Sequence, residues 1–375
     1  MPGIYIHIPF CRQACTYCNF HFSTSLNAKE NMIKAIKKEI ALTNDFIDEP
    51  VIESIYFGGG TPSLLSADEF AGIIESIHQK FRVTPNAEIT LEANPDDINS
   101  TILSRWLNAG VNRLSVGIQS FDDNELRWMN RSHNASQSLK CIDEIKLAGY
   151  VDFSVDLIYG SPLSTTECLV RNTGLIFQKE IPHISCYALT VEPGTRLDNH
   201  IKKKLSPGIN EDFQASQFSL LTERMQDAGY EHYEISNFAK PGSRSRHNSN
   251  YWQGKPYFGF GPSAHSFNGK IRKWNIANNA LYIQSIGNNI VPFEQEELTT
   301  NQQFNEYIMT SLRTIEGINI EKVRSTFGEY AEGLFSGSKK YIDNNLMISS
   351  GNHLVLTSKG KFLADGIASS LFVVR

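Results

Sequence analysis

The stretch HIPFCRQACTYCNF, residues 7–20, places three of the chain's six cysteines within eight positions. Their spacing is C-x3-C-x2-C, at Cys11, Cys15 and Cys18, and no second cysteine pair follows. A structural zinc ion takes four ligands in tetrahedral geometry, so His7 or His21 would have to complete such a site. An iron–sulfur cluster held by three thiolates instead keeps one iron open to a small molecule. We therefore predict a 4Fe-4S cluster with one open coordination position.

Six short apolar runs indicate buried strands, and helical patterns separate most of them. The expected strands span residues 4–8, 54–57, 88–91, 113–118, 153–158 and 184–189. The expected helices span residues 28–46, 66–81, 100–109 and 136–148, the second with a capping box formed by Ser66 and Glu69. Strands that alternate with helices predict a parallel sheet. Periodicity alone leaves open whether that sheet is doubly wound or an incomplete (β/α) barrel.

Polar or glycine-rich residues follow the ends of the expected strands. The cysteine loop follows the first strand, GGGTP (residues 58–62) the second, Glu92 the third and Gln119 the fourth, while Asp156 lies within the fifth. The carboxyl ends of parallel strands meet at one edge, where α/β proteins build their ligand sites. The sequence therefore predicts one large site, and its glycines favour close approach of a ligand to the backbone.

Composition limits the range of functions. The chain has 375 residues, of which 41% are hydrophobic and 20% charged, and its formal net charge is −5 at pH 7. This length predicts one large domain with a smaller one, and the acidic balance argues against nucleic acid as a partner. We find neither an apolar run of membrane-spanning length nor the pattern of a signal peptide, so we expect a cytoplasmic protein. Thiols stay reduced there, and Cys141, Cys168 and Cys186 are expected to be ordinary buried residues.

The cysteine motif after the first strand, followed by GGGTP after the second, resembles the radical S-adenosylmethionine (SAM) superfamily. The resemblance implies an α/β fold, a partial (β/α)6 barrel similar to a TIM barrel. It also implies that the amino and carboxylate groups of SAM bind the open iron of the cluster. Reduction of the cluster would then cleave SAM to a deoxyadenosyl radical, which the protein positions and shields from water.

Seven stretches narrow the resemblance: YIHIPFC (5–11), YFGGGTPS (56–63), LEANPD (91–96), GIQSF (117–121), DLIYGSP (156–162), HNSNYW (247–252) and LTSKGKFLADG (356–366). Together they are similar to the oxygen-independent coproporphyrinogen III oxidase family, most closely its heme chaperone branch, over essentially the whole chain. The resemblance implies a SAM site made of Tyr5, Gly59, Gly60, Thr61, Glu92, Gln119, Arg131 and Asp156. The oxidases hold a second SAM at the positions of Gly60, Thr61, Gln119, Arg131 and Asp156.

Two features separate the branches. The oxidases carry a further cysteine two positions after the third cluster ligand, where this chain has Phe20. HNSNYW is similar to a motif that the chaperone branch associates with heme, which implies His247 as an axial ligand and Tyr251 and Trp252 as a flat wall against the macrocycle. His265 is a second candidate ligand. On the residues alone, a loop histidine beside packed aromatic side chains is the simpler interpretation of His247.

We expect three regions along the chain. Residues 1–235 would form the barrel with the cluster and SAM site, residues 236–295 a connector with the heme motif, and residues 296–375 a smaller α+β domain. An expected helix over residues 300–316, with two short strands around Gly351 and Asn352 and a helix after them, predicts a winged-helix-like fold. Such a fold often binds DNA, but the acidic balance favours a lid or docking role here.

Two functions from different classes stay open. The first is a heme chaperone that uses a 4Fe-4S cluster and SAM and transfers heme to an acceptor protein, which could be membrane-associated. The second is an enzyme, an oxygen-independent coproporphyrinogen III oxidase of porphyrin biosynthesis. Both would need an electron donor for the cluster. The glycine strip at residues 58–61 disfavours a third function, an electron-transfer module without SAM.

Overall fold

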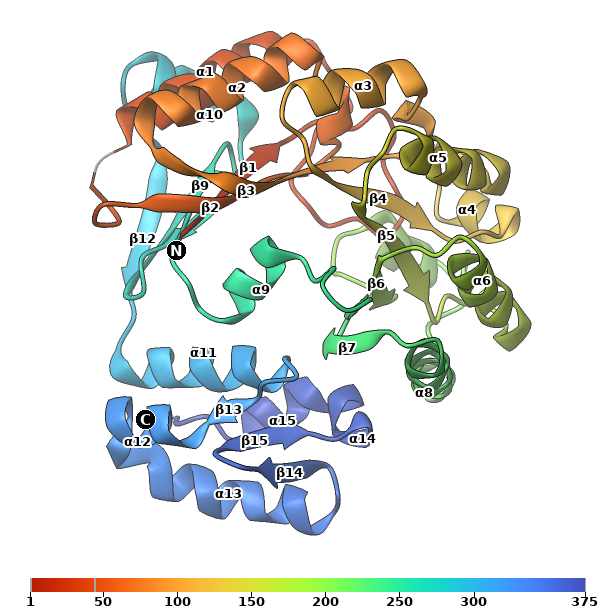
Figure 1. Cartoon of the computed structure of the whole chain (residues 1–375), viewed down its shortest axis with the longest axis vertical. Helices are drawn as coiled ribbons and strands as arrows, with labels where there is room; N and C mark the ends of the chain where they lie inside the picture. The colour runs from red at the N-terminus through yellow and green to blue at the C-terminus, as the bar shows by residue number, and fades with distance from the viewer. Residues whose placement is uncertain (1, 44, 375) are drawn as a thin grey trace.

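Six parallel strands form the centre of the computed structural model, which describes residues 2–43 and 45–374 (Figure 1). They lie side by side in chain order. Their bounds are Gly3–Ile8 for β1, Val51–Gly59 for β2, Arg82–Ala93 for β3, Arg113–Gln119 for β4, Asp152–Tyr159 for β5 and His183–Ala188 for β6. Each expected strand lies on one of these six, so the predicted parallel sheet is confirmed.

Helices cover the convex face of this sheet (Figure 1). They are α1 (Lys29–Leu42), α2 (Ala67–Lys80), α3 (Ser100–Asn108), α5 (Ala135–Leu147), α6 (Thr166–Gln178) and α8 (Glu211–Asp227). The predicted capping box of α2 is present, because Glu69 N–H donates to Ser66 Oγ over 3.2 Å and Ser66 N–H donates to Glu69 Oε2 over 2.7 Å. Side-chain oxygens thus satisfy backbone donors that a helix start otherwise leaves without partners.

Further strands extend both edges of the sheet. Beyond β6 lie β8 (Asn237–Ala239) and β7 (Glu231–Glu234), and beyond β1 lie β9 (Tyr257–Phe260), β10 (His265–Phe267), β11 (Ile271–Asn275) and β12 (Phe293–Glu297). Most of these strands come from the expected connector, residues 236–295, while β7 lies just before it and β12 ends just after it. In the described residues the two edge strands, β12 and β7, do not pair. The sheet therefore stays open as a partial barrel, while the domain boundaries stay a prediction.

Alternation along β1 separates the core from the site. Ile4, Ile6 and Ile8 are fully buried on one face of the strand, in the main hydrophobic core. Tyr5 and His7 point to the opposite face, because successive side chains of a strand alternate. The parallel register places Tyr5 beside Tyr56 of β2. The concave face of the sheet thus carries polar and aromatic side chains, and α9 (Arg246–Trp252) lies across its open side (Figure 1).

A smaller domain lies against that open side (Figure 1). It contains α11 (Thr300–Leu312), β13 (Ile318–Asn319), α12 (Ile320–Thr326), α13 (Ala331–Asp343), β14 (Met347–Ser350), β15 (His353–Leu356), α14 (Ser358–Phe362) and α15 (Ala364–Ser370). A core of its own and an antiparallel sheet of order β13-β15-β14 confirm the winged-helix-like arrangement. In the described chain no helix combines the length and apolar character needed to cross a membrane.

Candidate functional site

The cysteine loop lies between β1 and α1, and other segments hold it in place. Thr16 N–H donates to the carbonyl oxygen of Met129 over 3.0 Å, and the Thr16 carbonyl accepts from Leu197 N–H over 2.8 Å. Asn130 Nδ2 donates to the Ala14 carbonyl over 2.7 Å. The loop is therefore positioned by the chain after β4 and after β6, and its conformation depends on the whole barrel mouth.

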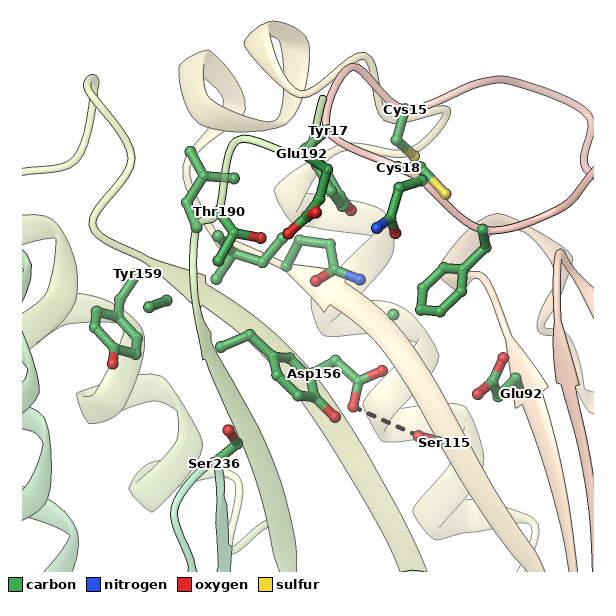
Figure 2. Close-up of a pocket in the computed structure, with 18 of the residues that line it drawn as sticks. Cys15, Tyr17, Cys18, Glu92, Ser115, Asp156, Tyr159, Thr190, Glu192 and Ser236 are labelled. Carbon is green, nitrogen blue, oxygen red and sulfur yellow. Dashed lines mark hydrogen bonds between the residues drawn. The ribbon is translucent and has the colours of Figure 1, made fainter. Parts of the chain in front are cut away.

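Cys11, Cys15 and Cys18 all line one cavity of about 600 Å³, here called the cysteine cavity. Figure 2 shows Cys15 and Cys18 on the loop above the strand ends, with Glu92 and Asp156 on the strands below. Burial raises the pKa of Cys11 to about 11 and also raises the pKa of Cys18. These two thiols are protonated at neutral pH without metal, so binding iron must release their protons.

The three cysteine thiols line one cavity without converging on a single point. Among the described residues no three His, Cys, Asp or Glu side chains converge on one point where a single metal ion would sit. A 4Fe-4S cluster does not require such convergence, because each thiolate binds a different iron. The other three cysteines, at positions 141, 168 and 186, are buried away from this cavity as expected.

Most of the predicted SAM residues line the same cavity. They are Gly59, Gly60, Thr61, Glu92, Gln119, Arg131 and Asp156. They come from the ends of β2 to β5 and from the segment after α4 (Asp123–Trp128), as the convergence of parallel strand ends predicts. Tyr5 is the exception: it lines a second cavity, and its ring stacks on Tyr56 with the centroids 6.1 Å apart.

The glycine strip packs directly against the cysteine loop and the strand before it. A Cβ on Gly60 would lie 2.6 Å from the carbonyl oxygen of Phe10 and 2.9 Å from that of Ile8. Gly59 has φ +106°, a conformation that other residues rarely adopt. Close packing thus requires glycine at position 60, and the backbone conformation favours glycine at position 59. The glycine strip and the cysteine loop together form one wall of the cavity.

Arg131 is a fixed donor in that wall. Its Nη1 donates to Cys15 Sγ over 3.2 Å, and its Nη2 donates to Asn94 Oδ1 over 2.6 Å and to the Gly117 carbonyl over 2.7 Å. Its Nε is buried and has no hydrogen-bond partner among residues 2–43 and 45–374. A buried donor without a partner is costly in a folded protein. The site therefore fits an additional acceptor group, such as the carboxylate of a cofactor.

Two partly buried carboxyls lie below the loop, Glu92 on β3 and Asp156 on β5, with β4 between the two strands. Burial raises the pKa of Glu92 to about 7, and Asp156 adds to the shift. Burial likewise raises the pKa of Asp156 to about 6, against hydrogen bonds from Ser185 and Ser115. Both groups titrate near neutral pH, so each can hold or release a proton there and can accept from a cationic ligand.

The second cavity has a volume of about 950 Å³ and is here called the aromatic cavity. His247, Tyr251, Trp252 and His265 all line it, so the structure brings the four heme candidates together. Five residues line both cavities: Asn19, Phe20, Tyr187, Ser236 and Arg313. The two cavities therefore adjoin each other across a shared wall.

His247 lies at the start of α9, so the motif is helical where a loop was the simpler expectation. Its Nδ1 lies 2.9 Å from Ser54 Oγ, and its ring stacks on Tyr56 with the centroids 5.0 Å apart. In the described chain its Nε2 has no hydrogen-bond partner. Burial lowers the pKa of His247 to about 4. The imidazole is therefore neutral at pH 7, as a metal ligand must be.

Buried Glu88 of β3 anchors the start of α9. Its two carboxylate oxygens accept from the backbone N–H groups of Arg246 and His247, each over 2.9 Å. At the other end of the helix, the Arg313 guanidinium lies over the ring of Trp252, with its Cζ 4.8 Å from the ring centroid. The HNSNYW motif is thus held by the barrel at one end and contacts the smaller domain at the other.

Several lining residues were not predicted from the sequence. Asn94 follows the end of β3, and Thr190 and Glu192 follow the end of β6, so the rule of polar strand ends would have found these three; Tyr187 lies within β6. Arg313 lies at the end of α11, and no local pattern links it to the barrel. Only the tertiary structure places it in both cavities.

Comparison with known proteins agrees with this geometry. Residues 5–171 match the radical SAM superfamily, and residues 298–363 match the HemN C-terminal domain. The chain is 32% identical to the heme chaperone HemW of Bacillus subtilis (strain 168), over 98% of each chain. It is 30% identical to the heme chaperone HemW of Mycobacterium tuberculosis (strain ATCC 25618 / H37Rv), over 98% of this chain and 94% of the relative.

The chain belongs to the HemW family of radical SAM proteins. The predicted resemblance is therefore confirmed. A solved structure of Escherichia coli coproporphyrinogen III oxidase (HemN), described as a radical SAM enzyme, superposes with a TM-score of 0.85 over 99% of this chain and 90% of that one. At 20% identity this likeness concerns the fold. It confirms the partial barrel with a smaller C-terminal domain.

Proposed function

We propose that this protein is a heme chaperone, which binds heme in the aromatic cavity and passes it to an acceptor protein. The observation that carries the proposal is that the HNSNYW motif lines a cavity of about 950 Å³. That volume suits a large apolar cofactor. A neutral His247 supplies a ligand nitrogen for iron, and Tyr251 and Trp252 supply aromatic contact area.

We further propose that Cys11, Cys15 and Cys18 hold a 4Fe-4S cluster and that SAM binds beside it in the cysteine cavity. When bound and reduced, the cluster supplies the electron that cleaves SAM. Arg131 would offer its unpartnered Nε to an acceptor group of the cofactor. Glu92, which lines the same cavity, would accept from its amino group. The shared wall between the cavities would let the state of one affect the other.

Oxygen-independent coproporphyrinogen III oxidation is the second candidate, and one observation favours it. The five positions that match the second SAM of the oxidases all line the cysteine cavity. Phe20 argues against this function, because it stands where the oxidases have a further cysteine. Anaerobic incubation of the reconstituted protein with SAM and coproporphyrinogen III decides the matter: formation of protoporphyrinogen would favour the oxidase, and its absence the chaperone.

Separate variants of the two cavities test the chaperone proposal. His247→Ala should weaken hemin binding about tenfold or more, since it removes one iron ligand while the aromatic walls remain (about 1.4 kcal/mol per factor of ten). Its iron–sulfur content and its response to SAM should stay unchanged. Cys15→Ala should lose the cluster and keep hemin binding. Hemin titration followed by Soret absorption, with iron and sulfide assays after anaerobic reconstitution, measures both effects.

Matched controls come from the same chain. His78, an exposed histidine of α2, and Cys141, a buried cysteine of α5, should tolerate replacement by Ala with both readouts intact. Undiminished hemin affinity in His247→Ala, together with protoporphyrinogen formed by the unmodified protein, would overturn the chaperone proposal.

A further inference from the structure

We propose that Lys255 binds a propionate carboxylate of the porphyrin and so determines which edge of the macrocycle faces the end of α9. The inference rests on the proposed function, because it requires a carboxylated porphyrin in the aromatic cavity. Within residues 2–43 and 45–374, three cationic side chains line that cavity: Lys255, Arg272 and Arg313. The structure distinguishes them by what already surrounds each charge.

The two arginines are already paired with acidic side chains. Their carboxylate partners are Glu296 and Glu306 for Arg272, and Glu234 and Asp365 for Arg313. Each guanidinium therefore faces two carboxylates. A third carboxylate would meet an environment that is already negative, and it would have to displace an existing ion pair.

Lys255 differs from both arginines. Its Nζ donates to Asn250 Oδ1 over 2.8 Å, and in the described part of the chain it has no carboxylate partner. Its backbone N–H donates to the Asn250 carbonyl over 3.0 Å, so the residue is tied to α9 at two points. An ammonium group has three N–H donors, and a neutral amide uses only one of them. The charge is thus held in place without being neutralised.

The position of Lys255 suits the shape of heme. Residues 247–255 carry a ligand nitrogen at His247, aromatic surface at Tyr251 and Trp252, and the ammonium at Lys255, all in the lining of one cavity. Heme has a central iron, a flat apolar macrocycle and two carboxylates on one edge. One short segment therefore offers a contact for each of these three parts, and the ammonium meets the carboxylate edge.

Comparison of hemin with hemin dimethyl ester isolates this contact. The unmodified full-length chain should bind hemin about tenfold more tightly than the diester, because a charge-assisted hydrogen bond is lost with the ester. Lys255→Gln should bind hemin about tenfold more weakly than the unmodified chain does. Its affinity for the diester should equal that of the unmodified chain. Lys255→Arg should recover most of the preference for hemin. Lys203→Gln, at an exposed lysine outside both cavities, serves as the control and should match the unmodified chain.

The thermodynamic cycle of two proteins and two ligands also gives the results that would overturn the inference. Unchanged hemin affinity in Lys255→Gln would do so, and so would an equal loss for hemin and diester, which would indicate a structural role for the lysine. Failure of the unmodified chain to bind hemin at all would instead overturn the proposed function on which the inference depends.

Discussion

Glu92 shows how burial turns an ordinary carboxyl into a group that titrates near neutral pH. Burial raises its pKa to about 7, while its ordinary value of 4.5 applies in the unfolded chain. Between these two pH values the folded protein holds a proton that the unfolded chain has released. Stability from this group is therefore fully present below pH 4.5 and is lost as the pH rises through 7.

Replacing Glu92 by Gln tests this directly. The variant cannot ionise, so its stability relative to the unmodified protein should rise by about 2 to 3 kcal/mol between pH 5 and pH 8. Denaturant unfolding at the two pH values measures the change. Glu223→Gln, at an exposed glutamate of α8, serves as the matched control variant. An equal difference between Glu92→Gln and the unmodified protein at both pH values would contradict the buried, protonated carboxyl.

At the scale of elements, α9 is a short helix whose position depends on one buried carboxylate. Glu88 accepts from the backbone N–H groups of Arg246 and His247, and Ser245 Oγ lies 3.4 Å from the same carboxylate. A helix of seven residues has little stability of its own. Its orientation over the sheet is therefore set by β3, where Glu88 lies.

Glu88→Ala should loosen the start of α9. Two backbone donors would lose their buried acceptor, so we expect a loss of about 2 kcal/mol in the free energy of unfolding. Hydrogen exchange of the Arg246 and His247 amides should become faster. Ser66→Ala, which removes the cap of α2, should cost about 1 kcal/mol and leave the exchange of α9 unchanged. Unaltered exchange at α9 in Glu88→Ala would show that other contacts fix the helix.

The elements that the sequence predicts are those with a repeated pattern. Ile4, Ile6 and Ile8 alternate with polar or aromatic residues over a whole strand, so the strand is recognisable from the sequence. Polar residues at the ends of such strands identify most of the lining of the cysteine cavity. The strand β13 has only two residues, and α9 has no fully buried side chain, so neither produces a periodic signal. The aromatic cavity depends on contacts between distant segments, such as Ser54 with His247, which no local pattern encodes.

For the whole molecule, Arg313 is one of the side chains that join the two domains, beside the ion pairs Arg272–Glu306 and Arg244–Glu316. It follows α11 of the smaller domain, and its Nε donates to Glu234 Oε1 of β7 over 3.1 Å. Its Nη1 lies 3.0 Å from Asp365 of α15, and its guanidinium covers the ring of Trp252. The Glu234 side chain is only 1% exposed, so its charge depends on this partner.

Arg313→Met should therefore destabilise the protein by about 3 kcal/mol, because it leaves a buried carboxylate without its cationic partner. Denaturant unfolding gives the value. Arg313→Lys should retain part of the stability, and Lys339→Met, which removes an exposed pair with Asp343, should cost less than about 0.5 kcal/mol. A loss in Arg313→Met no larger than that of Lys339→Met would show that the ion pair does not join the domains.

The wall shared by the two cavities has a consequence for the order in which ligands bind. Phe20, Tyr187 and Arg313 line both cavities, so a ligand in one alters the surroundings of the other. Free energies around a closed cycle of binding steps sum to zero. Under the proposed function, whatever factor SAM applied to the affinity for heme, heme would have to apply to the affinity for SAM. Occupancy of either cavity would then change the affinity of the other cavity for its ligand, by the same factor in both directions.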